Sequence, residues 1–479
     1  MALSLALDLG TTSIAAVAVD PDGNIVARVQ QANTATVSGL PPGHSEQDPL
    51  KLRELVCQVL SELTSHLPLP PIGLGLTGQM HGMMLVDPTG HPLGRLITWQ
   101  DRRANETARL RSGDSTQSSW LELYMESCDP RELSTTGAHP APGYMGVTLA
   151  MLIASDAIPP STAGTTFLAD WIASELTHTP ITTDRSNAAA SGLFDLALDR
   201  WNPTLLHAGR IPADWMPEVV ESGTIVGNLT SEWAARTGLP VGLPVCGAIG
   251  DNQAAVLGSL PIGETAIQVN VGTGGQISWP VSSFQRVNSM DTRYLPHERF
   301  LLVGAGLAGG DAYAWVNRTA RDWLRPFGTE PSSDEIYATL SEAASTVPPD
   351  ANGLVCEPLF RGTRREPLAR GRFAGVTFDN FTPAHVARAV LTGIAEGFAW
   401  FYENAGSARP SGCGRIIGSG NGLRQNPLLV DSLQRRFGLP VVLTEHDQEA
   451  AFGAALLCGS QCGIWPDLAT ASQTIRLTA

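Results

Sequence analysis

The chain has 479 residues, with 31 Lys and Arg against 46 Asp and Glu, so its formal net charge is −15. This length predicts two to three domains with substantial cores, and the negative charge disfavours nucleic acid and anionic membranes as partners. Lys51 is the only lysine, and no glycine run precedes it, which excludes a Walker A phosphate loop. Protein-kinase and Schiff-base chemistry would need that lysine in a strand or a pocket. Phosphate, if bound, must be held by backbone amides, hydroxyls, arginine and metal.

The seven cysteines are scattered without CxxC pairs, which argues against a disulfide framework and against a zinc site. Cys458 and Cys462, the closest pair, lie near the end of an apolar, helix-like run and are expected to pack there. The first residues lack the basic region of a signal peptide, and no apolar run reaches the length of a membrane span. We therefore expect a cytoplasmic protein, and the sequence leaves open whether it is a monomer or a homodimer.

Alternating apolar residues predict three strands near the start of the chain, at 4–7, 14–19 and 25–29. The first two are joined by Asp8-Leu9-Gly10-Thr11-Thr12-Ser13, a hairpin whose tip holds glycine and hydroxyl groups. Asp48 is the expected N-cap of a helix that begins at Pro49. A strand over 72–77 then runs into Gly78-Gln79-Met80-His81-Gly82. Strand and helix signals alternate from there on, which is typical of an α/β protein with mixed sheets.

The opening pattern recurs past the midpoint. A strand over 243–249 ends in Gly250-Asp251-Asn252-Gln253, and a strand over 265–271 reaches Gly272-Thr273-Gly274-Gly275 before 276–279 returns beside it. A strand, a Gly/Thr hairpin and a returning strand thus occur twice. We predict two similarly built domains, residues 1–245 and 246–479.

The second half closes with two helix signals. Thr382-Pro383 is expected to cap a long helix, and the glycine cluster Gly418-Ser419-Gly420-Asn421-Gly422 precedes another.

The two Gly/Thr hairpins are candidate anion sites. Glycines and threonines at a strand turn present N–H and hydroxyl groups in a small concavity that needs no lysine. One such hairpin is usually only a turn, but two in matching positions could hold successive phosphates of one nucleotide across a cleft. Asp8, directly before the first hairpin, is a natural Mg²⁺ ligand. An Asx-type turn contact is the structural alternative for this residue.

Taken together, these motifs resemble those of the FGGY carbohydrate kinases in order and spacing over essentially the whole chain. They are the two hairpins, 78–82, Trp99-Gln100-Asp101-Arg102-Arg103, 250–253 and 418–422. The resemblance implies two actin-like, ribonuclease-H-like α/β domains around an interdomain cleft. It also implies transfer of the γ-phosphoryl group of ATP, with Mg²⁺, to a sugar hydroxyl. Asp251 would be the catalytic base, and a helix N-cap is its alternative role.

The same resemblance assigns the remaining site residues. The sugar side would comprise Met80, His81, Trp99, Asp101, Arg102 and Asp251, and Asp8 would hold the metal. The nucleotide side would comprise Gly10, Thr11, Thr12, Gly272, Thr273, Gly309, Gly310, Gly418, Gly420 and Asn426. The segment 183–188 matches a further cleft-lining motif. Structural alternatives remain: Trp99 as a core residue, Asp101 and Arg102 as an exposed pair at a helix start, and the glycines as turns or helix starts.

The sugar is less closely specified than the reaction. The motifs at 78–82 and 272–275 resemble xylulokinases, whereas those at 98–102, 187–193 and 418–437 resemble sedoheptulokinases, and 250–253 fits both. We therefore expect a ketose kinase that converts sedoheptulose to sedoheptulose 7-phosphate, with D-xylulose, giving xylulose 5-phosphate, as the alternative. Two other classes stay open: an actin-like ATPase, which has no need of the sugar-side residues, and a sugar-sensing pseudokinase, which has no need of Asp8 and Asp251.

Overall fold

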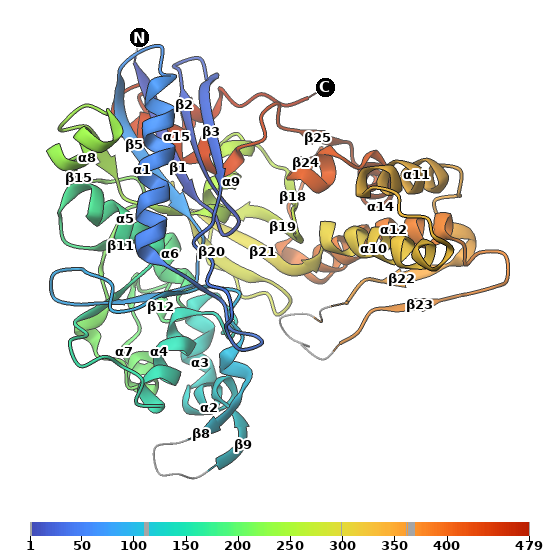
Figure 1. Cartoon of the computed structure of the whole chain (residues 1–479), viewed down its shortest axis with the longest axis horizontal. Coiled ribbons are helices and arrows are strands. Elements are labelled where there is room, and N and C mark those ends of the chain that lie inside the picture. Colours follow the sequence, from blue (N-terminus) through green and yellow to red (C-terminus); the bar gives the residue numbers. More distant parts are fainter. Residues whose placement is uncertain (1, 110–114, 298, 361, 363–368, 479) are drawn as a thin grey trace.

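The structure is a computed structural model that describes residues 2–109, 115–297, 299–360, 362 and 369–478. Two mixed β-sheets organise the chain, one in each half (Figure 1). The first has the order β15-β16-β5-β1-β2-β3, with β17 also paired to β5. Its strands are β1 (Leu3–Leu9), β2 (Ser13–Val19), β3 (Ile25–Ala32), β5 (Pro71–Gly78), β15 (Ile225–Asn228), β16 (Pro244–Cys246) and β17 (Ile249–Gly250).

The second sheet repeats the centre of the first. Its order is β20-β21-β19-β18-β24-β25, and its strands are β18 (Ile267–Val271), β19 (Gly274–Val281), β20 (Asp291–Leu295), β21 (Arg299–Ala308), β24 (Ile416–Ser419) and β25 (Val441–Leu443). β18 runs antiparallel to β19 and parallel to β24, just as β1 runs antiparallel to β2 and parallel to β5. The duplication expected from the two Gly/Thr hairpins is confirmed.

Helices cover the outer face of each sheet. On the first sheet these are α1 (Pro49–Ser65), α5 (Leu168–Thr177) and α8 (Ser231–Thr237). On the second they are α10 (Gly310–Leu324), α11 (Ser333–Ser345), α12 (Pro383–Asn404) and α14 (Pro427–Phe437). The expected caps are present: Asp48 accepts hydrogen bonds from the first turn of α1, and Thr382 accepts one from His385 in α12.

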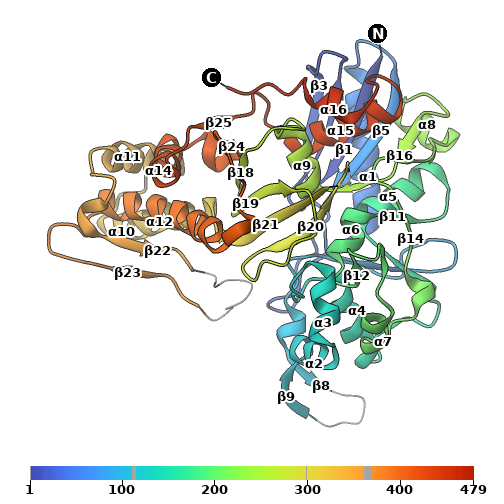
Figure 2. The same cartoon turned by 180° about the vertical axis from the view of Figure 1, so that it is seen from behind.

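Two helices lie between the sheets and share one apolar core with both (Figure 2). They are α9 (Asp251–Ser259) and α15 (Glu449–Gln461), followed by the short α16 (Leu468–Ser472). Ala6 and Val17 of the first sheet, Val303 and Ile417 of the second, and Phe452 of α15 belong to this one cluster. The first sheet therefore depends on a helix that comes late in the sequence.

Much of the segment 83–216, apart from α5, builds a separate core below the first sheet. Its helices are α2 (Trp120–Ser127), α3 (Pro130–Leu133), α4 (Met145–Ala154) and α7 (Pro203–Ala208). Helix α6 (Arg185–Ala190) packs instead in a small cluster with Phe194 and Tyr294. Short two-stranded ladders complete the fold: β4 (Glu46–Gln47) with β7 (Leu96–Ile97), β6 (Met84–Val86) with β10 (Gly164–Thr166), β8 (Thr107–Arg109) with β9 (Ser115–Ser119), β11 (Thr182–Asp184) with β14 (Glu218–Val220), β12 (Phe194–Asp195) with β13 (Arg200–Trp201), and β22 (Val355–Glu357) with β23 (Arg372–Ala374).

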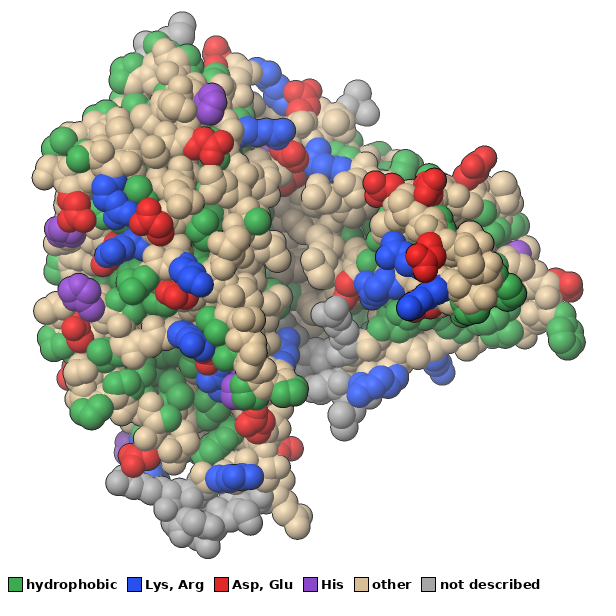
Figure 3. Space-filling view, viewed as in Figure 1, with side chains coloured by type: hydrophobic (Ala, Val, Ile, Leu, Met, Phe, Trp, Pro, Cys, Tyr) green, Lys and Arg blue, Asp and Glu red, His purple; other side chains and the backbone are tan. Residues whose placement is uncertain are grey.

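Acidic and basic side chains are interspersed on the face seen in Figure 3, which is deeply hollowed between the two halves of the molecule. Within the described ranges, the chain has no helix of the length and apolarity that crossing a membrane requires.

Candidate active site

Three neighbouring parallel strands bring Asp8 and Asp251 to one edge of the first sheet. Asp8 of β1 is in register with Thr77 of β5, and Thr77 is in register with Ile249 of β17. Asp251 follows two residues later, as the first residue of α9. The carboxyl ends of parallel strands meet at one sheet edge, where ligands commonly bind in α/β folds.

Burial raises the pKa of both carboxyl groups. Burial, followed by the charge of Asp251, raises the pKa of Asp8 to about 7. Burial raises the pKa of Asp251 to about 6, opposed by the backbone N–H of Asn252 and by the charge of Arg293. A carboxylate with a pKa near the working pH is suited to accept a hydroxyl proton.

Several buried polar atoms around this edge have no hydrogen-bond partner within the described part of the chain. They are Asp8 Oδ1, Thr77 Oγ1, Asn187 Nδ2, Asn252 Oδ1 and both side-chain amide atoms of Gln253. Buried polar groups are nearly always paired in folded proteins, with protein or with ordered water, so this group of atoms calls for an external partner. A hydroxylated molecule or a cation at this edge would provide it.

On the expected sugar side, Met80 and His81 lie next to the strand that leads to Asp251. A Cβ atom on Gly250 would come within 2.5 Å of Met80 Cε, so the thioether lies directly on the backbone before Asp251. His81 stacks on Tyr144, with ring centroids 4.1 Å apart. Its Nδ1 contacts the Ala190 carbonyl oxygen at 2.8 Å, and its Nε2 contacts Arg293 at 3.3 Å. The second contact places the imidazole beside the guanidinium whose charge acts on Asp251.

Arg293 also connects this side to a cavity. Its guanidinium donates to Asp291 at 3.0 Å, and Asp291 lies 3.2 Å from His139 Nδ1. Asp291 and His139 line one end of a cavity of about 870 Å³ that extends between β21, β22 and α12. None of the nucleotide-side residues expected from the sequence lines this cavity.

Trp99 joins the sugar side to the first hairpin. Its indole N–H donates to Thr11 Oγ1 at 2.9 Å, and Thr11 Oγ1 lies 3.3 Å from Gln79 Oε1. Gln79 donates to Gln47, which in turn donates to the Thr11 carbonyl oxygen. The ring of Trp99 is partly exposed and does not belong to the core.

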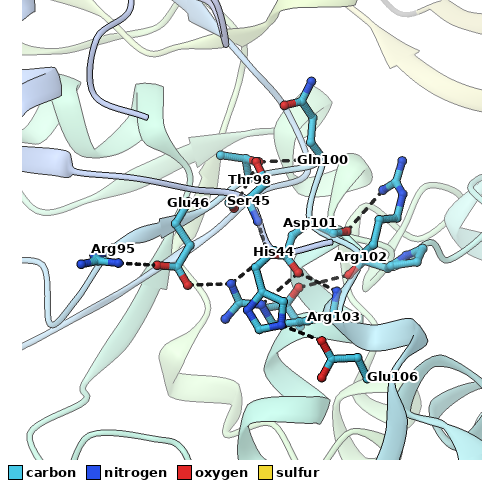
Figure 4. A network of polar contacts seen from close by, with 12 residues as sticks. His44, Ser45, Glu46, Arg95, Thr98, Gln100, Asp101, Arg102, Arg103 and Glu106 are labelled. Atoms are coloured by element: carbon cyan, nitrogen blue, oxygen red, sulfur yellow. Dashed lines mark hydrogen bonds and ion pairs between the residues drawn. The ribbon is translucent and has the colours of Figure 1, made fainter. Parts of the chain in front are cut away.

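Asp101 is fully buried and already has partners for both carboxylate oxygens (Figure 4). Oδ1 accepts from the backbone and side chain of Arg103, and Oδ2 accepts from Arg103 and from the backbone N–H of Ser45. Arg103 pairs further with Glu46, which pairs with Arg95. This arrangement suits Asp101 to hold the 98–103 loop in place. The guanidinium of Arg102, in contrast, donates to the Trp99 carbonyl oxygen from an exposed position.

The carbonyl groups at the tip of the first hairpin are all occupied from outside it. Asn33 donates to the carbonyl oxygens of Gly10 and Thr12, and Gln47 donates to that of Thr11. Because the peptide groups are trans, the following N–H groups point the opposite way. The Thr12 side chain is exposed.

The second hairpin is held in the same manner by the start of α10. Gly310 N–H donates to the Gly272 carbonyl oxygen at 2.8 Å, and Asp311 N–H donates to that of Thr273 at 3.0 Å. A Cβ atom on Gly309 would lie 2.4 Å from the Gly274 carbonyl carbon. Glycine at 309 thus permits the approach of α10 to the hairpin, and Thr273 stays exposed.

The remaining residues of the expected nucleotide side lie in β24 and after its end. Gly420 has a φ of +85°, and a Cβ atom there would lie 2.6 Å from the Val271 carbonyl oxygen, next to Gly272. Gly418 lies within β24, paired with Val269. Asn426 caps α14 through a hydrogen bond from Leu429 N–H and also contacts Tyr313 of α10. The structure thus places Gly309, Gly310 and Gly420 against the second hairpin, whereas Asn426 lies at the start of α14.

A hydrogen bond links the two halves of the site. Asn252, next to Asp251, donates through Nδ2 to Gln276 Oε1 at 2.8 Å, and Gln276 is in register with Asn270 beside the second hairpin. Asn270 occupies the place in the second sheet that Asp8 occupies in the first, and it donates to Ser419 at 3.0 Å. Of the two equivalent strand ends, the first carries a carboxylate and the second an amide.

The segment 183–188 supports the strand that carries Asp251. Asp184 accepts hydrogen bonds from Ser186 and Ser222, and Ser186 Oγ accepts one from Gly250 N–H at 2.8 Å. This segment fixes the position of Gly250.

The motifs did not identify Arg293, Tyr144 or Gln47 as site residues. Arg293 is a single arginine in the strand Asp291–Leu295, and its burial beside His81 arises from contacts between distant segments. No local pattern signals such a position.

Comparison with known protein families agrees with this arrangement. The model of the FGGY carbohydrate kinase N-terminal domain matches residues 3–126 and 161–258, and the model of the C-terminal domain matches 273–462. The chain belongs to the FGGY family of carbohydrate kinases. It is therefore a phosphotransferase that acts on a sugar hydroxyl, with the two-domain actin-like, ribonuclease-H-like fold.

Individual FGGY kinases carry several different names. A glycerol kinase of Alkalilimnicola ehrlichii is 30% identical, covering 96% of this chain and 90% of its own length. A human sedoheptulokinase is 27% identical, covering 95% of this chain and 97% of its own. The crystal structure of xylulose kinase from Rhodospirillum rubrum superposes with a TM-score of 0.85 at 25% identity, over 100% of this chain and 93% of that one. These relatives define the reaction class and leave the acceptor to be decided.

Proposed function

We propose that this FGGY kinase phosphorylates a ketose, with sedoheptulose as the first candidate and D-xylulose as the alternative. The observation that carries the proposal is the position of the Met80-His81 pair against Gly250, directly beside Asp251. The relatives named sedoheptulokinase and xylulose kinase support the substrate class. A relative named glycerol kinase is equally similar, so glycerol is the polyol that the test must exclude.

In the proposed reaction, Asp251 accepts the proton of the attacking sugar hydroxyl. The Arg293 charge and the Asn252 N–H favour its ionised form. Met80 and Trp99 offer apolar surface to the C–H face of the sugar. Asn187 Nδ2 and the side-chain amide of Gln253, which have no partner among the described residues, are available to its hydroxyl groups. The two hairpins would hold the phosphates of ATP through N–H groups and the Thr12 and Thr273 hydroxyls. Positioning and charge stabilisation are the main requirements of phosphoryl transfer.

The residues present fit a Mg²⁺ ion. Among the described residues Asp8 Oδ1 has no partner although it is buried, and the charge of Asp251 acts on Asp8. A divalent cation bound by Asp8, directly or through water, would relieve both. When bound, Mg²⁺ would neutralise charge on the transferred phosphoryl group. We assign Asp8 as its protein ligand.

The test is an ADP-release assay with Mg²⁺ and a panel of acceptors: sedoheptulose, D-xylulose, D-ribulose, L-ribulose, glycerol and gluconate. We expect the highest kcat/KM with sedoheptulose and loss of sugar-dependent turnover in Asp251→Asn, with ADP binding retained. Asp334→Asn, an exposed carboxyl group at the start of α11, is the control and should behave as wild type. A preference for glycerol or gluconate would overturn the ketose proposal. Equal sugar-dependent rates in Asp251→Asn and wild type would overturn the role of Asp251.

A further inference from the structure

Three cysteines that are far apart in the sequence meet in the fold. Cys246 ends β16, Cys458 lies in α15 and Cys462 is the C-cap residue of the same helix. Their sulfur atoms all lie within 4.8 Å of one another. The spacing argument from the sequence, which found no CxxC pair, missed this cluster because its members come from two elements that only the tertiary fold brings together.

The position of the cluster is closely defined. Cys246 is 1% exposed and Cys458 is 0% exposed, whereas Cys462 is partly exposed. A Cβ atom on Gly73 of β5 would lie 2.5 Å from Cys462 Sγ and 2.8 Å from Cys458 Sγ. The sulfur atoms of Cys458 and Cys462 therefore lie directly on the β5 backbone, at a point where any side chain would displace them.

The three thiols interact with one another. Contacts with Cys246 and Cys458 lower the pKa of Cys462, and contacts with Cys246 and Cys462 raise the pKa of Cys458. Cys462 is the one of the three that solvent can reach. The thiolate is the form of cysteine that binds metal.

We propose that Cys246, Cys458 and Cys462 form a binding site for one thiophilic closed-shell cation of the Zn²⁺, Cd²⁺ or Cu⁺ class. Soft thiolate ligands select such ions. Three sulfur ligands at about 2.3 Å from a central ion lie roughly 4 Å apart, a separation within the limit that the cluster meets. The partly exposed side at Cys462 provides an entry path and room for a water ligand.

Binding involves no oxidation or reduction. Each thiol that becomes a ligand releases its proton to solvent, so the affinity for the cation rises with pH. The bound ion would tie α15 to β16, and β16 leads within five residues to Asp251. The site is separate from the candidate active site and does not rest on the identity of the sugar.

The experiment uses the full, reduced, metal-free chain and Cd²⁺ alone as the probe. We expect an ultraviolet thiolate-to-cadmium charge-transfer band that saturates at one equivalent per chain. Outer groups that only support a ligand change metal affinity by about 10–100-fold, so Cys462→Ser should weaken binding by at least about tenfold. Cys356→Ser, which removes a buried cysteine outside the cluster, should leave the band unchanged.

A second measurement, the thermal unfolding midpoint with and without Cd²⁺, distinguishes loss of the binding site from loss of the fold. Cd²⁺ should raise the Tm of the wild type and of Cys356→Ser, and should not raise that of Cys462→Ser, whose partly exposed position makes the substitution mild. Cys246→Ser should lose the band as well. The proposal is overturned if wild type gives no saturable band, or if the band survives unchanged in Cys462→Ser and Cys246→Ser.

Discussion

Arg293 is a charged side chain that favours the ionised form of the candidate base. Its guanidinium is buried, pairs with Asp291, contacts His81 and lowers the pKa of Asp251 against the effect of burial. Because Asp251 must be ionised to accept a proton, activity should fall as the pH drops through its pKa of about 6.

Substituting Arg293→Gln removes the charge that opposes the burial of Asp251. The pKa of Asp251 should rise, so the acidic limb of kcat/KM should move to higher pH by roughly one unit. Arg293→Lys keeps a positive charge and should shift the limb less. The measurement is the pH profile of kcat/KM for each variant. An unchanged limb in a folded Arg293→Gln protein would show that the two groups are not coupled.

The raised pKa of Asp8 affects the pH dependence of folding stability. Its pKa is 3.8 in the unfolded chain and about 7 in the metal-free fold, so the folded state binds the proton more tightly. Stability contributed by the protonated group is therefore lost as the pH rises from about 4 to about 7.

We expect Asp8→Asn to be more stable than wild type at pH 8, by on the order of 1–2 kcal/mol, and nearly equal to it at pH 4. Urea unfolding without divalent cations, at several pH values, measures the difference. Asp334→Asn serves as the exposed control. Equal stability of Asp8→Asn and wild type at pH 8 would contradict the raised pKa.

At the scale of elements, the loop that carries Trp99 is fixed by the ion pairs around Asp101 (Figure 4). Asp101→Asn leaves Arg103 with a weaker partner in a buried setting and should lower the free energy of unfolding by about 1.5–3 kcal/mol. It should also raise KM for the sugar, because Trp99 loses its support. Arg95→Gln breaks only the exposed pair with Glu46 and should change stability by less than about 1 kcal/mol. Equal effects of the two changes would contradict the structural role of Asp101.

A substitution at Gly420 tests whether ADP binds beside the second hairpin. Gly420→Ala places a Cβ atom 2.6 Å from the Val271 carbonyl oxygen, at a φ of +85°, and should weaken ADP binding by roughly tenfold or more because the adjacent hairpin must shift. Gly412→Ala also has a positive φ, of +72°, but meets no atom within 4 Å. Calorimetric titration of both variants with ADP separates the effect of the close contact with Val271 from the effect of the positive φ alone. Unaltered binding in Gly420→Ala would place the nucleotide elsewhere.

The sequence predicted many elements well. The strands at 4–7, 14–19, 25–29 and 72–77 and the helices that begin at Pro49 and Pro383 are present, because their signals are local: alternation, an N-cap and proline at the first turn. The residues of the two Gly/Thr hairpins could also be predicted as candidate site residues, because their signal is local in the sequence. Arg293 and the three clustered cysteines could not, because their surroundings are formed by segments hundreds of residues apart.

At the scale of the whole molecule, the two sheets are joined through α9 and α15. The inner face of the first sheet packs against α15, which belongs to the second half of the sequence. The domain boundary near residue 245 stays a prediction, and the N-terminal family model extends beyond it to residue 258.

We expect residues 1–245, produced alone, to be insoluble or to unfold without a cooperative transition, because Ala6, Val17 and Val19 would lie uncovered. Full-length protein should show a transition in which both sheets unfold together. Circular dichroism and urea unfolding of the two proteins provide the measurement. A soluble 1–245 fragment with cooperative unfolding would contradict the dependence on α15.

The late position of α15 has a consequence for biosynthesis. The strands of the first sheet leave the ribosome early, but the helix that covers their inner face is translated about 440 residues after β1 begins. During most of translation this apolar face has no partner within the chain, so it is the surface that a chaperone would bind. The same helix that places Cys458 beside β5 therefore makes completion of the nascent chain the step that commits the first sheet to its native state.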